Sequence, residues 1–192
     1  GDAASAEAWV EAVLRLAPEV AAFDDVPGPD ACALAVRAAL FGTLVIYAVP
    51  LEDAVAAGHF LEQLPLGRGV AAAALSAVVA VRLVRETCPD CRVDAELPIE
   101  LSAAVKLAGA PAEASYARGR GCEACSHTGW RRKRPLFEVV ALDKERRQRL
   151  VEGRADDLAA LLAAARPDSI RAQAVRLAAA GAIAVEELGH VL

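Results

Sequence analysis

Four of the five cysteines lie in two short clips, CPDC at 88–91 and CEAC at 122–125. Two residues between the cysteines of a clip let both sulfur atoms turn toward one metal ion, and two clips supply the four thiolates of a tetrahedral zinc site. Gly121 and Gly129 flank the second clip, where the backbone has to fold tightly. A site closed by four cysteines leaves no position for a substrate, so we expect a structural zinc ion. The predicted ligands are Cys88, Cys91, Cys122 and Cys125.

Disulfides and redox chemistry are the competing interpretations of the clips. The sequence opens with GDAASAEAWVEAV, which has neither the basic start nor the apolar run of an export signal, and this disfavours disulfides and predicts a cytoplasmic location. A thioredoxin-like site needs one such motif at a helix start rather than two matched ones. His127 could replace one sulfur, but a surface imidazole in a turn is favoured. Cys32 lies on an apolar helix face and is expected to be a small buried residue.

A basic patch accompanies the second clip. Cationic clips with an aromatic residue, here Trp130, recur in nucleic-acid binding, so a zinc-stabilised nucleic-acid module is one alternative. The formal net charge of -5 disfavours it and favours a solvated face or a surface for an acidic partner. The candidate contact surface consists of Arg118, Arg120, Arg131, Arg132, Lys133 and Arg134.

Two strands, each followed by a helix, indicate a parallel α/β layer in the first half. The strand at 43–49, TLVIYAV, is apolar on both faces and is expected to be buried on both sides. Asp30 is expected to cap the helix that follows the first strand. The apolar run Val70–Val81 is shorter than the about 20 residues that a bilayer crossing needs, so we expect a buried helix and no membrane insertion. The elements predicted before the first clip are helices at 7–17, 30–41, 51–64 and 68–86, a strand within PEVAAF and the strand at 43–49.

Pro, Gly and charged residues are frequent from 88 to 134, where only ELSAAVKLAG is typical of a regular element. PLFEVVAL predicts a strand, and short Ala/Leu helices broken at Gly153, Pro167 and Gly181 follow it. Glu186 and Glu187 are expected in the first turn of the last helix, where the helix dipole favours them. The predicted domains are residues 1–86, 87–134 and 135–192.

The segments RLVRETCPDC, GCEACSHTGWRRKRPLFEVVALD and GAIAVEELGHVL resemble, in this order, the C-terminal half of the type II secretion and type IV pilus assembly ATPases. The segment from PEVAAF to PLEDA is similar to the region of their Walker B motif and histidine box. The resemblance implies an α/β fold: a partial RecA-like parallel sheet with flanking helices, a tetracysteine zinc-binding lobe and a C-terminal helical region.

The catalytic motifs of that family are degenerate in this sequence. No phosphate loop of the form Gly-x-x-x-x-Gly-Lys-Ser/Thr occurs in it. The Walker B region places Asp25 where the family has its catalytic Glu, with Pro27 and Gly28 after it, and the two histidines of the histidine box align with Thr43 and Pro50. We therefore expect no bound nucleotide and no ATP hydrolysis.

The resemblance implies a pseudo-ATPase domain that works in protein–protein assembly. Its expected partners are secretion or pilus assembly proteins, an ATPase paralogue or further copies of itself, and these would hold a cytoplasmic protein peripherally at the inner membrane. The main alternative is the C-terminal fragment of an active motor whose phosphate loop lies outside this chain.

Overall fold

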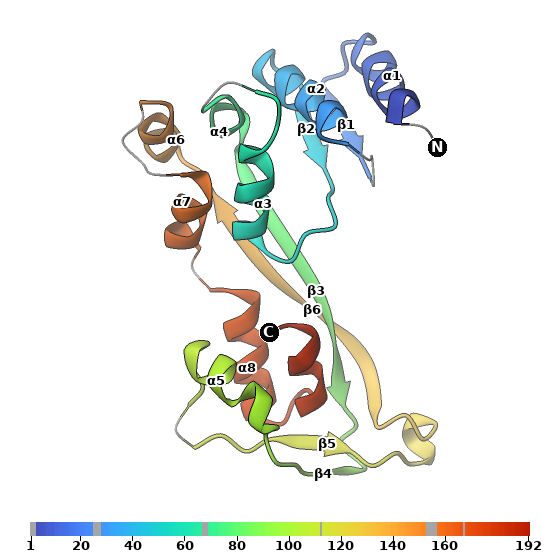
Figure 1. Cartoon of the computed structure of the whole chain (residues 1–192). Helices are drawn as coiled ribbons and strands as arrows, with labels where there is room; N and C mark the ends of the chain where they lie inside the picture. The colour runs from blue at the N-terminus through green and yellow to red at the C-terminus, as the bar shows by residue number, and fades with distance from the viewer. Residues whose placement is uncertain (1–2, 25–27, 67–68, 112, 153–156, 167) are drawn as a thin grey trace. The chain divides into compact units, whose positions relative to one another are not determined.

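The computed structural model describes residues 3–24, 28–66, 69–111, 113–152, 157–166 and 168–192 (Figure 1). The chain divides into two compact units. Unit 1 consists of residues 1–79 and 139–166, and unit 2 consists of residues 80–138 and 167–192. None of the helices in the described ranges combines the length and the apolar character that a bilayer crossing demands.

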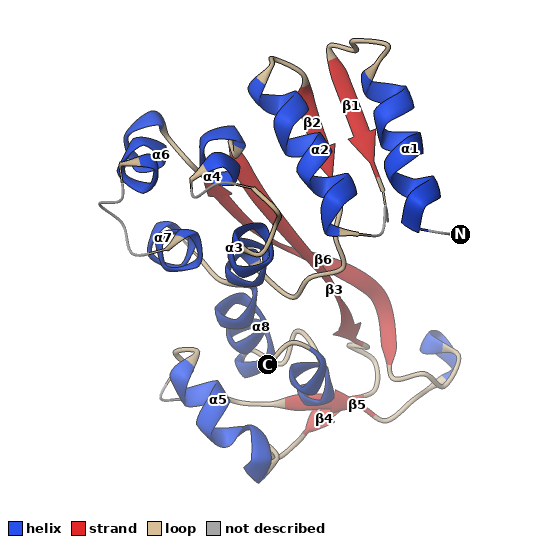
Figure 2. Cartoon of the chain, turned by 45° about the horizontal axis from the view of Figure 1, so that its top comes forward, coloured by secondary structure: helices blue, strands red, loops and turns tan. Residues whose placement is uncertain are grey.

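Unit 1 contains a parallel strand pair with helices beside it (Figure 2). Val20 of the first strand pairs with Leu44 of the second, and Phe23 pairs with Tyr47. The parallel pairing confirms the predicted α/β arrangement of this part of the chain. The helices and strands of unit 1 are α1 (Ala3–Leu14), β1 (Val20–Phe23), α2 (Pro29–Leu40), β2 (Leu44–Tyr47), α3 (Ala54–Glu62), α4 (Val70–Ala74), α6 (Lys144–Val151) and α7 (Leu158–Ala165).

One face of the β1–β2 pair is buried against α1 and α2. Ala21 and Phe23 join Val10, Ala31 and Ala35 in a buried apolar cluster. Small alanine side chains on α2 let the helix lie close to the strands, so the alanine-rich composition serves close packing here.

The other face of the pair is exposed, and the prediction of a strand buried on both sides is wrong. Val20 is 54% exposed, Leu44 58% and Ile46 57%. A strand that is apolar on both faces is buried on both only where elements cover both. In the described part of this chain, the packing covers one face.

Helix α2 begins one residue earlier than predicted, and Asp30 is not its cap. Gly28, with φ of 104°, occupies the capping position and Pro29 the first helical position, where its fixed φ suits a helix start. Asp30 lies in the first turn, where its negative charge still interacts favourably with the helix dipole.

Helices α3 and α7 pack at unusually short distance through a glycine. A Cβ atom on Gly58 would lie 2.6 Å from the Cα atom of Ala159. Around this contact, Ala54, Leu158 and Leu162 belong to a second buried cluster of unit 1. The absence of a side chain at Gly58 therefore sets how closely the two helices approach.

The prediction of a helix at 68–86 is confirmed only for its first part and is wrong for the rest. The structure has the short helix α4 and then strand β3 (Ala77–Thr87), which pairs with β6 (Trp130–Ala141). Exposure alternates along β3: Val79, Val81 and Leu83 are exposed, whereas Val84 is fully buried. The β-branched residues of this segment suit a pleated strand, and pairing with β6 prevails over the helix propensity of its alanines.

Unit 2 is built around β3, β6 and the C-terminal helices. Its largest buried apolar side chains include Val84, Val105, Leu136, Val175 and Ile183. Strands β4 and β5, which pair in antiparallel fashion, were not predicted from the sequence. Strand β6 was predicted to begin at Pro135, whereas it begins at Trp130. The remaining elements of unit 2 are β4 (Arg92–Asp94), η1 (Ile99–Leu101), α5 (Ser102–Leu107), β5 (Ala117–Gly119), η2 (Glu123–Cys125), α8 (Ile170–Ala179) and η3 (Val185–His190).

The predicted short helices after the last strand are confirmed by α6, α7, α8 and the 3₁₀ helix η3. Gly153 and Pro167, two of the predicted breaks, lie outside the described residues. Glu138 of β6 is fully buried, and its Oε2 accepts a hydrogen bond of 3.1 Å from the backbone N–H of Ile170. This contact satisfies a donor at the start of α8 and fixes that helix to the strand.

Candidate metal centre

Both clips lie in unit 2, at the ends of its strands. Cys88 directly follows β3 and Cys91 directly precedes β4, while Cys122 precedes η2 and Cys125 is its last residue. The backbone N–H of Cys88 donates to the carbonyl of Gly129, just before β6, at 2.9 Å. The pairing of β3 with β6 thus brings together two clips that are far apart in the sequence.

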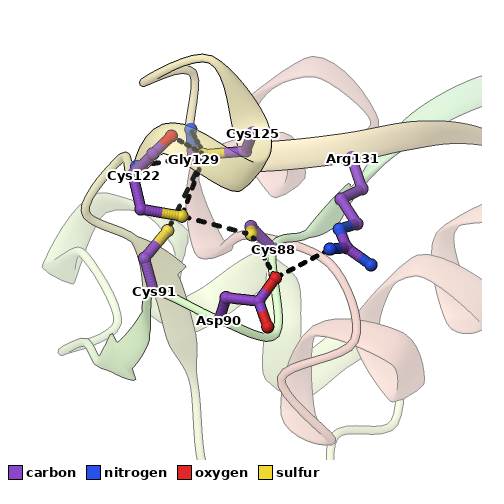
Figure 3. Close-up of polar contacts among 7 residues, drawn as sticks. All are labelled: Cys88, Asp90, Cys91, Cys122, Cys125, Gly129 and Arg131. Atoms are coloured by element: carbon purple, nitrogen blue, oxygen red, sulfur yellow. Dashed lines mark hydrogen bonds and ion pairs between the residues drawn. The ribbon is translucent and has the colours of Figure 1, made fainter.

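The four predicted zinc ligands form one cluster (Figure 3). Their sulfur atoms all lie within 4.8 Å of one another, with Sγ–Sγ distances of 4.0 Å for Cys88–Cys122, 3.9 Å for Cys91–Cys125 and 3.8 Å for Cys122–Cys125. A tetrahedral zinc ion with Zn–S bonds of about 2.3 Å requires S–S edges of about 3.8 Å. A disulfide requires about 2.05 Å. The donor set therefore fits a tetrahedral metal ion, and all five cysteines of the chain are free thiols.

Backbone N–H groups point at two of the sulfurs. Gly121 donates to Cys91 Sγ at 3.3 Å, and Cys122 and Gly129 both donate to Cys125 Sγ at 3.2 Å. The N–H of Cys122, followed by that of Gly129, lowers the pKa of Cys125 to about 6. Desolvation, together with the neighbouring sulfurs, raises the pKa of Cys91 to about 12. Ionisation of one cysteine is thus favoured, but several thiolates so close together would repel one another. A divalent cation at their centre would let all four cysteines ionise.

The glycines beside the second clip are required by its turn. Gly121 has φ of 89°, and a Cβ atom there would lie 2.6 Å from the carbonyl oxygen of His127. Gly129 has φ of 80°, and its Cβ would lie 2.7 Å from the carbonyl oxygen of Gly119. His127 is exposed in this turn and is not a member of the cysteine cluster, which confirms its predicted place.

An ion pair connects the first clip to the start of β6. Arg131 Nη2 donates to Asp90 Oδ2 at 2.8 Å, and the same carboxylate oxygen lies 3.9 Å from Cys88 Sγ (Figure 3). Both charged side chains are about half exposed, so the pair contributes little stability by itself. Its effect is to hold the Asp90 carboxylate beside the sulfur cluster.

Three of the six residues of the predicted contact surface, Arg131, Arg132 and Arg134, are ion-paired. Arg132 and Arg134 both bind the carboxylate of Glu86, and these guanidinium groups, Arg132 first, hold the pKa of Glu86 below its usual value. Arg118, Arg120 and Lys133 are exposed. The six basic residues therefore do not form one uniform positive patch, because carboxylates of β3 and of the first clip lie among them.

The ion pair between Arg85 and Glu187 of unit 2 was also missed by sequence reasoning. Glu187 is in the first turn of η3, as predicted, but it is only 4% exposed and accepts hydrogen bonds from the backbone N–H of Arg85 at 2.8 Å and from its Nε at 2.6 Å. The Arg85 guanidinium also lies 5.9 Å from the ring centroid of Trp130. A partner 102 residues away leaves no local signal in the sequence.

The structure describes only part of the positions that the resemblance assigns to the family's catalytic motifs. Asp25 and Pro27 lie outside the described residues. Thr43 Oγ1 donates to the carbonyl of Pro18 at 3.2 Å, so its hydroxyl holds the loop before β1, and Pro50 is exposed.

Comparison with known proteins finds the same family over nearly the whole chain. The family model described as "Type II/IV secretion system protein" matches residues 3–190. Type II secretion system protein E of Aeromonas hydrophila is 31% identical over 139 residues, which are 72% of this chain and 28% of that protein. Type II secretion system protein HxcR of Pseudomonas aeruginosa is 30% identical over 183 residues, 95% of this chain and 35% of that protein.

A pilus protein is similarly related. Type IV pilus assembly ATPase PilB of Thermus thermophilus is 30% identical over 146 residues, 76% of this chain and 16% of that protein. The chain therefore spans at most 35% of the length of these three relatives. The match of the family model to residues 3–190 includes both clips and both units, and the chain belongs to the type II/IV secretion system protein family.

Proposed function

We propose that this chain is a non-catalytic, zinc-stabilised assembly domain of a secretion or pilus machine. The observation that carries the proposal is the cluster of four sulfurs within 4.8 Å of one another, with edges that fit a tetrahedral ion. Cys88, Cys91, Cys122 and Cys125 would all coordinate zinc, which leaves no open position for a substrate or an activated water. Such a site contributes to folding and shape.

Each part of the site has a separate task in this proposal. The four cysteines bind the ion, which supplies the positive charge that lets neighbouring thiolates coexist. The N–H groups of Gly121 and Gly129 orient two of the sulfurs and stabilise their negative charge. Structural zinc contributes about 10–16 kcal/mol of apparent binding energy in small peptides. That is of the same order as the net stability of a whole domain.

We propose that the domain is non-catalytic because the sequence lacks residues that nucleotide binding and hydrolysis need. This sequence contains no phosphate loop, and Thr43 and Pro50 occupy the positions of the family's two histidines. Asp25 could hold a magnesium ion through water, but a carboxylate without bound phosphates has little to polarise. We therefore assign no nucleotide to residues 1–192.

The parallel pairing of β1 with β2, and the helix α2 that connects them along the chain, fit a partial RecA-like sheet. With this interpretation, residues 1–86 are the degenerate motor part, 87–134 the zinc-binding lobe and 135–192 a strand with the C-terminal helices. The domain would bind assembly proteins, an ATPase paralogue or further copies of itself. These partners would hold it peripherally at the cytoplasmic side of the inner membrane.

One alternative is favoured by a specific observation. The chain spans only 16–35% of the length of the three relatives described above, one of which is named an ATPase. It could therefore be the C-terminal part of an active motor whose phosphate loop lies in another segment. A nucleic-acid module has less support, because Arg131, Arg132 and Arg134 already bind carboxylates.

Metal analysis and nucleotide titration test the proposal together. We expect the purified chain to contain stoichiometric zinc, and we expect no heat of binding when ATP and magnesium are titrated into it. Saturable ATP binding would favour the motor fragment and overturn the non-catalytic assignment. A metal-free chain in which residues 88–134 resist proteolysis as well as they do after zinc addition would overturn the zinc assignment.

A further inference from the structure

A pocket of about 800 Å³ lies in unit 2 beside the second clip. Its lining includes Thr87 at the end of β3, Pro89 of the first clip, Ala124 and Ser126 around the second, and residues 130–132 at the start of β6. A volume of this size lies within the range of about 300–1,000 Å³ typical of ligand sites. Cys125 of the metal centre also contributes to the lining, so the pocket lies directly against the sulfur cluster.

The charges at this pocket leave a positive excess. Two guanidinium groups, those of Arg131 and Arg132, and one carboxylate, that of Glu86, line the pocket, and each guanidinium is ion-paired, Arg131 with Asp90 and Arg132 with Glu86. The side chains of Arg131 and Arg132 are 52% and 74% exposed, so both reach solvent while paired. A guanidinium group has five N–H donors, and these pairs use only part of them. The pocket can therefore accept one further carboxylate without losing its internal ion pairs.

A buried hydroxyl at the pocket lacks a hydrogen-bond partner. Thr87 is only 7% exposed, and its Oγ1 has no partner among the described residues. Native proteins rarely leave a buried hydroxyl unsatisfied. Because a hydroxyl both donates and accepts, Thr87 can bind a carboxylate oxygen or a peptide N–H that enters the pocket.

The remaining walls favour a peptide over a nucleic acid. Pro89, Ala124 and the Trp130 ring supply apolar surface next to the charged groups. The guanidinium of Arg85 already lies 5.9 Å from the centroid of the Trp130 ring, on the aromatic surface that a nucleic-acid base would use for stacking.

We propose that this pocket binds an acidic, partly apolar peptide segment of an assembly partner. One carboxylate of the segment binds Arg131 and Arg132, its backbone or a carboxylate oxygen satisfies Thr87 Oγ1, and an adjacent apolar side chain packs on Pro89 and Trp130. The inference rests on the proposed function, because it names the chemistry of the partner that such an assembly domain would bind.

Peptide titration at low salt tests this inference. The probe is a short, capped, fluorescent peptide of alternating Glu and Leu, added to the zinc-loaded chain and followed by anisotropy. A matched peptide with Gln in place of Glu should bind about tenfold more weakly, because charge-assisted hydrogen bonds are lost. The double variant Arg131→Gln/Arg132→Gln should lose a similar factor, whereas Arg118→Gln, the same change on the exposed surface of β5, should bind as the parent does.

Thr87 provides a test that does not change any charge. Thr87→Val should weaken binding of the Glu peptide about fivefold, and Thr87→Ser, which keeps the hydroxyl, should retain it. Zinc content and thermal midpoint are measured for every variant, and if the double variant loses zinc, the Val and Ser pair at position 87 decides the outcome.

Several results would overturn the inference. One is equal binding of the Gln and Glu peptides, and another is parent-like binding by both the double variant and Thr87→Val. A third is preference for an oligothymidylate strand over the Glu peptide, which would indicate a nucleic-acid surface. Absence of peptide binding by a zinc-loaded chain that binds no ATP refutes only the peptide pocket. ATP binding refutes the non-catalytic proposal whatever the peptide does.

Discussion

Replacing one ligand of the sulfur cluster should release the metal and loosen the clips without unfolding the rest of the chain. We choose Cys125→Ser, because Cys125 is only 7% exposed and accepts N–H bonds from both Cys122 and Gly129. Serine preserves the size of the residue but replaces a soft thiolate, which zinc prefers, by a hydroxyl that stays protonated at neutral pH.

The expected loss follows from the number of equivalent ligands. If a structural site supplies about 10–16 kcal/mol and four thiolates share it, one ligand accounts for about 2.5–4 kcal/mol, or about 10²–10³-fold in zinc affinity. Competition with a chromophoric chelator measures this loss. Limited proteolysis should then cut the variant between residues 88 and 134 while leaving unit 1 protected.

The matched control is Cys32→Ser. Cys32 is also buried, at 3% exposed, but it lies in α2 of unit 1 and is not a member of the cluster. The Cys32→Ser variant should bind zinc as tightly as the parent does, but its unit 1 should be less stable. Unchanged zinc affinity in Cys125→Ser, or an equal loss in both variants, would refute the assignment of the ligands.

Three further changes test the packing and the electrostatics of the two units. Glu187→Gln should destabilise unit 2 by about 1–3 kcal/mol in urea, because the backbone and side-chain N–H groups of Arg85 lose their charged, buried acceptor, whereas Glu186→Gln on the exposed side should be near neutral. Gly58→Ala should cost about 1–3 kcal/mol and lower the melting temperature by forcing the α7 backbone away, whereas Gly189→Ala, where a Cβ meets nothing within 4 Å, should be tolerated. Burial raises the pKa of Cys32 to about 11 in the folded chain, so its contribution to stability is complete below about pH 9 and is lost as the pH rises through 11. Cys32→Ala should reduce this alkaline loss in unfolding curves recorded between these pH values.

The sequence predicted best what depends on short spacing. The two residues between the cysteines of each clip fix which sulfurs can face one ion, and the structure brings together the four cysteines that this spacing singled out. The parallel β1–β2 arrangement was also predictable, because alternating helix and strand patterns leave few possible topologies.

What the sequence could not predict depends on partners far along the chain. Residues 77–86 were predicted as part of a helix at 68–86 because the run from Val70 to Val81 is rich in alanine, and only pairing with β6 makes this segment a strand. The same holds for the acidic residues. Glu86 receives Arg132 and Arg134 from 46 and 48 residues away, and Glu187 receives Arg85 from a distance of 102 residues. No local pattern marks an acidic residue as one that will be paired.

The distribution of apolar packing explains why a metal would be needed at this particular place. The buried hydrophobic cluster of unit 2 includes no residue from 85–94 or from 117–135, the two segments that carry the clips. Sulfur coordination would hold together two clips whose cysteines Cys88 and Cys122 are 34 positions apart, at the ends of a segment that only its middle, around Val105, fixes to the apolar core. The clips should therefore unfold locally when zinc is removed, while the cluster around Val84 and Ile183 stays packed. Hydrogen exchange after chelation should accordingly accelerate at 88–94 and 117–130 and remain slow in α8, whereas equal acceleration throughout unit 2 would mean that the metal stabilises the whole unit.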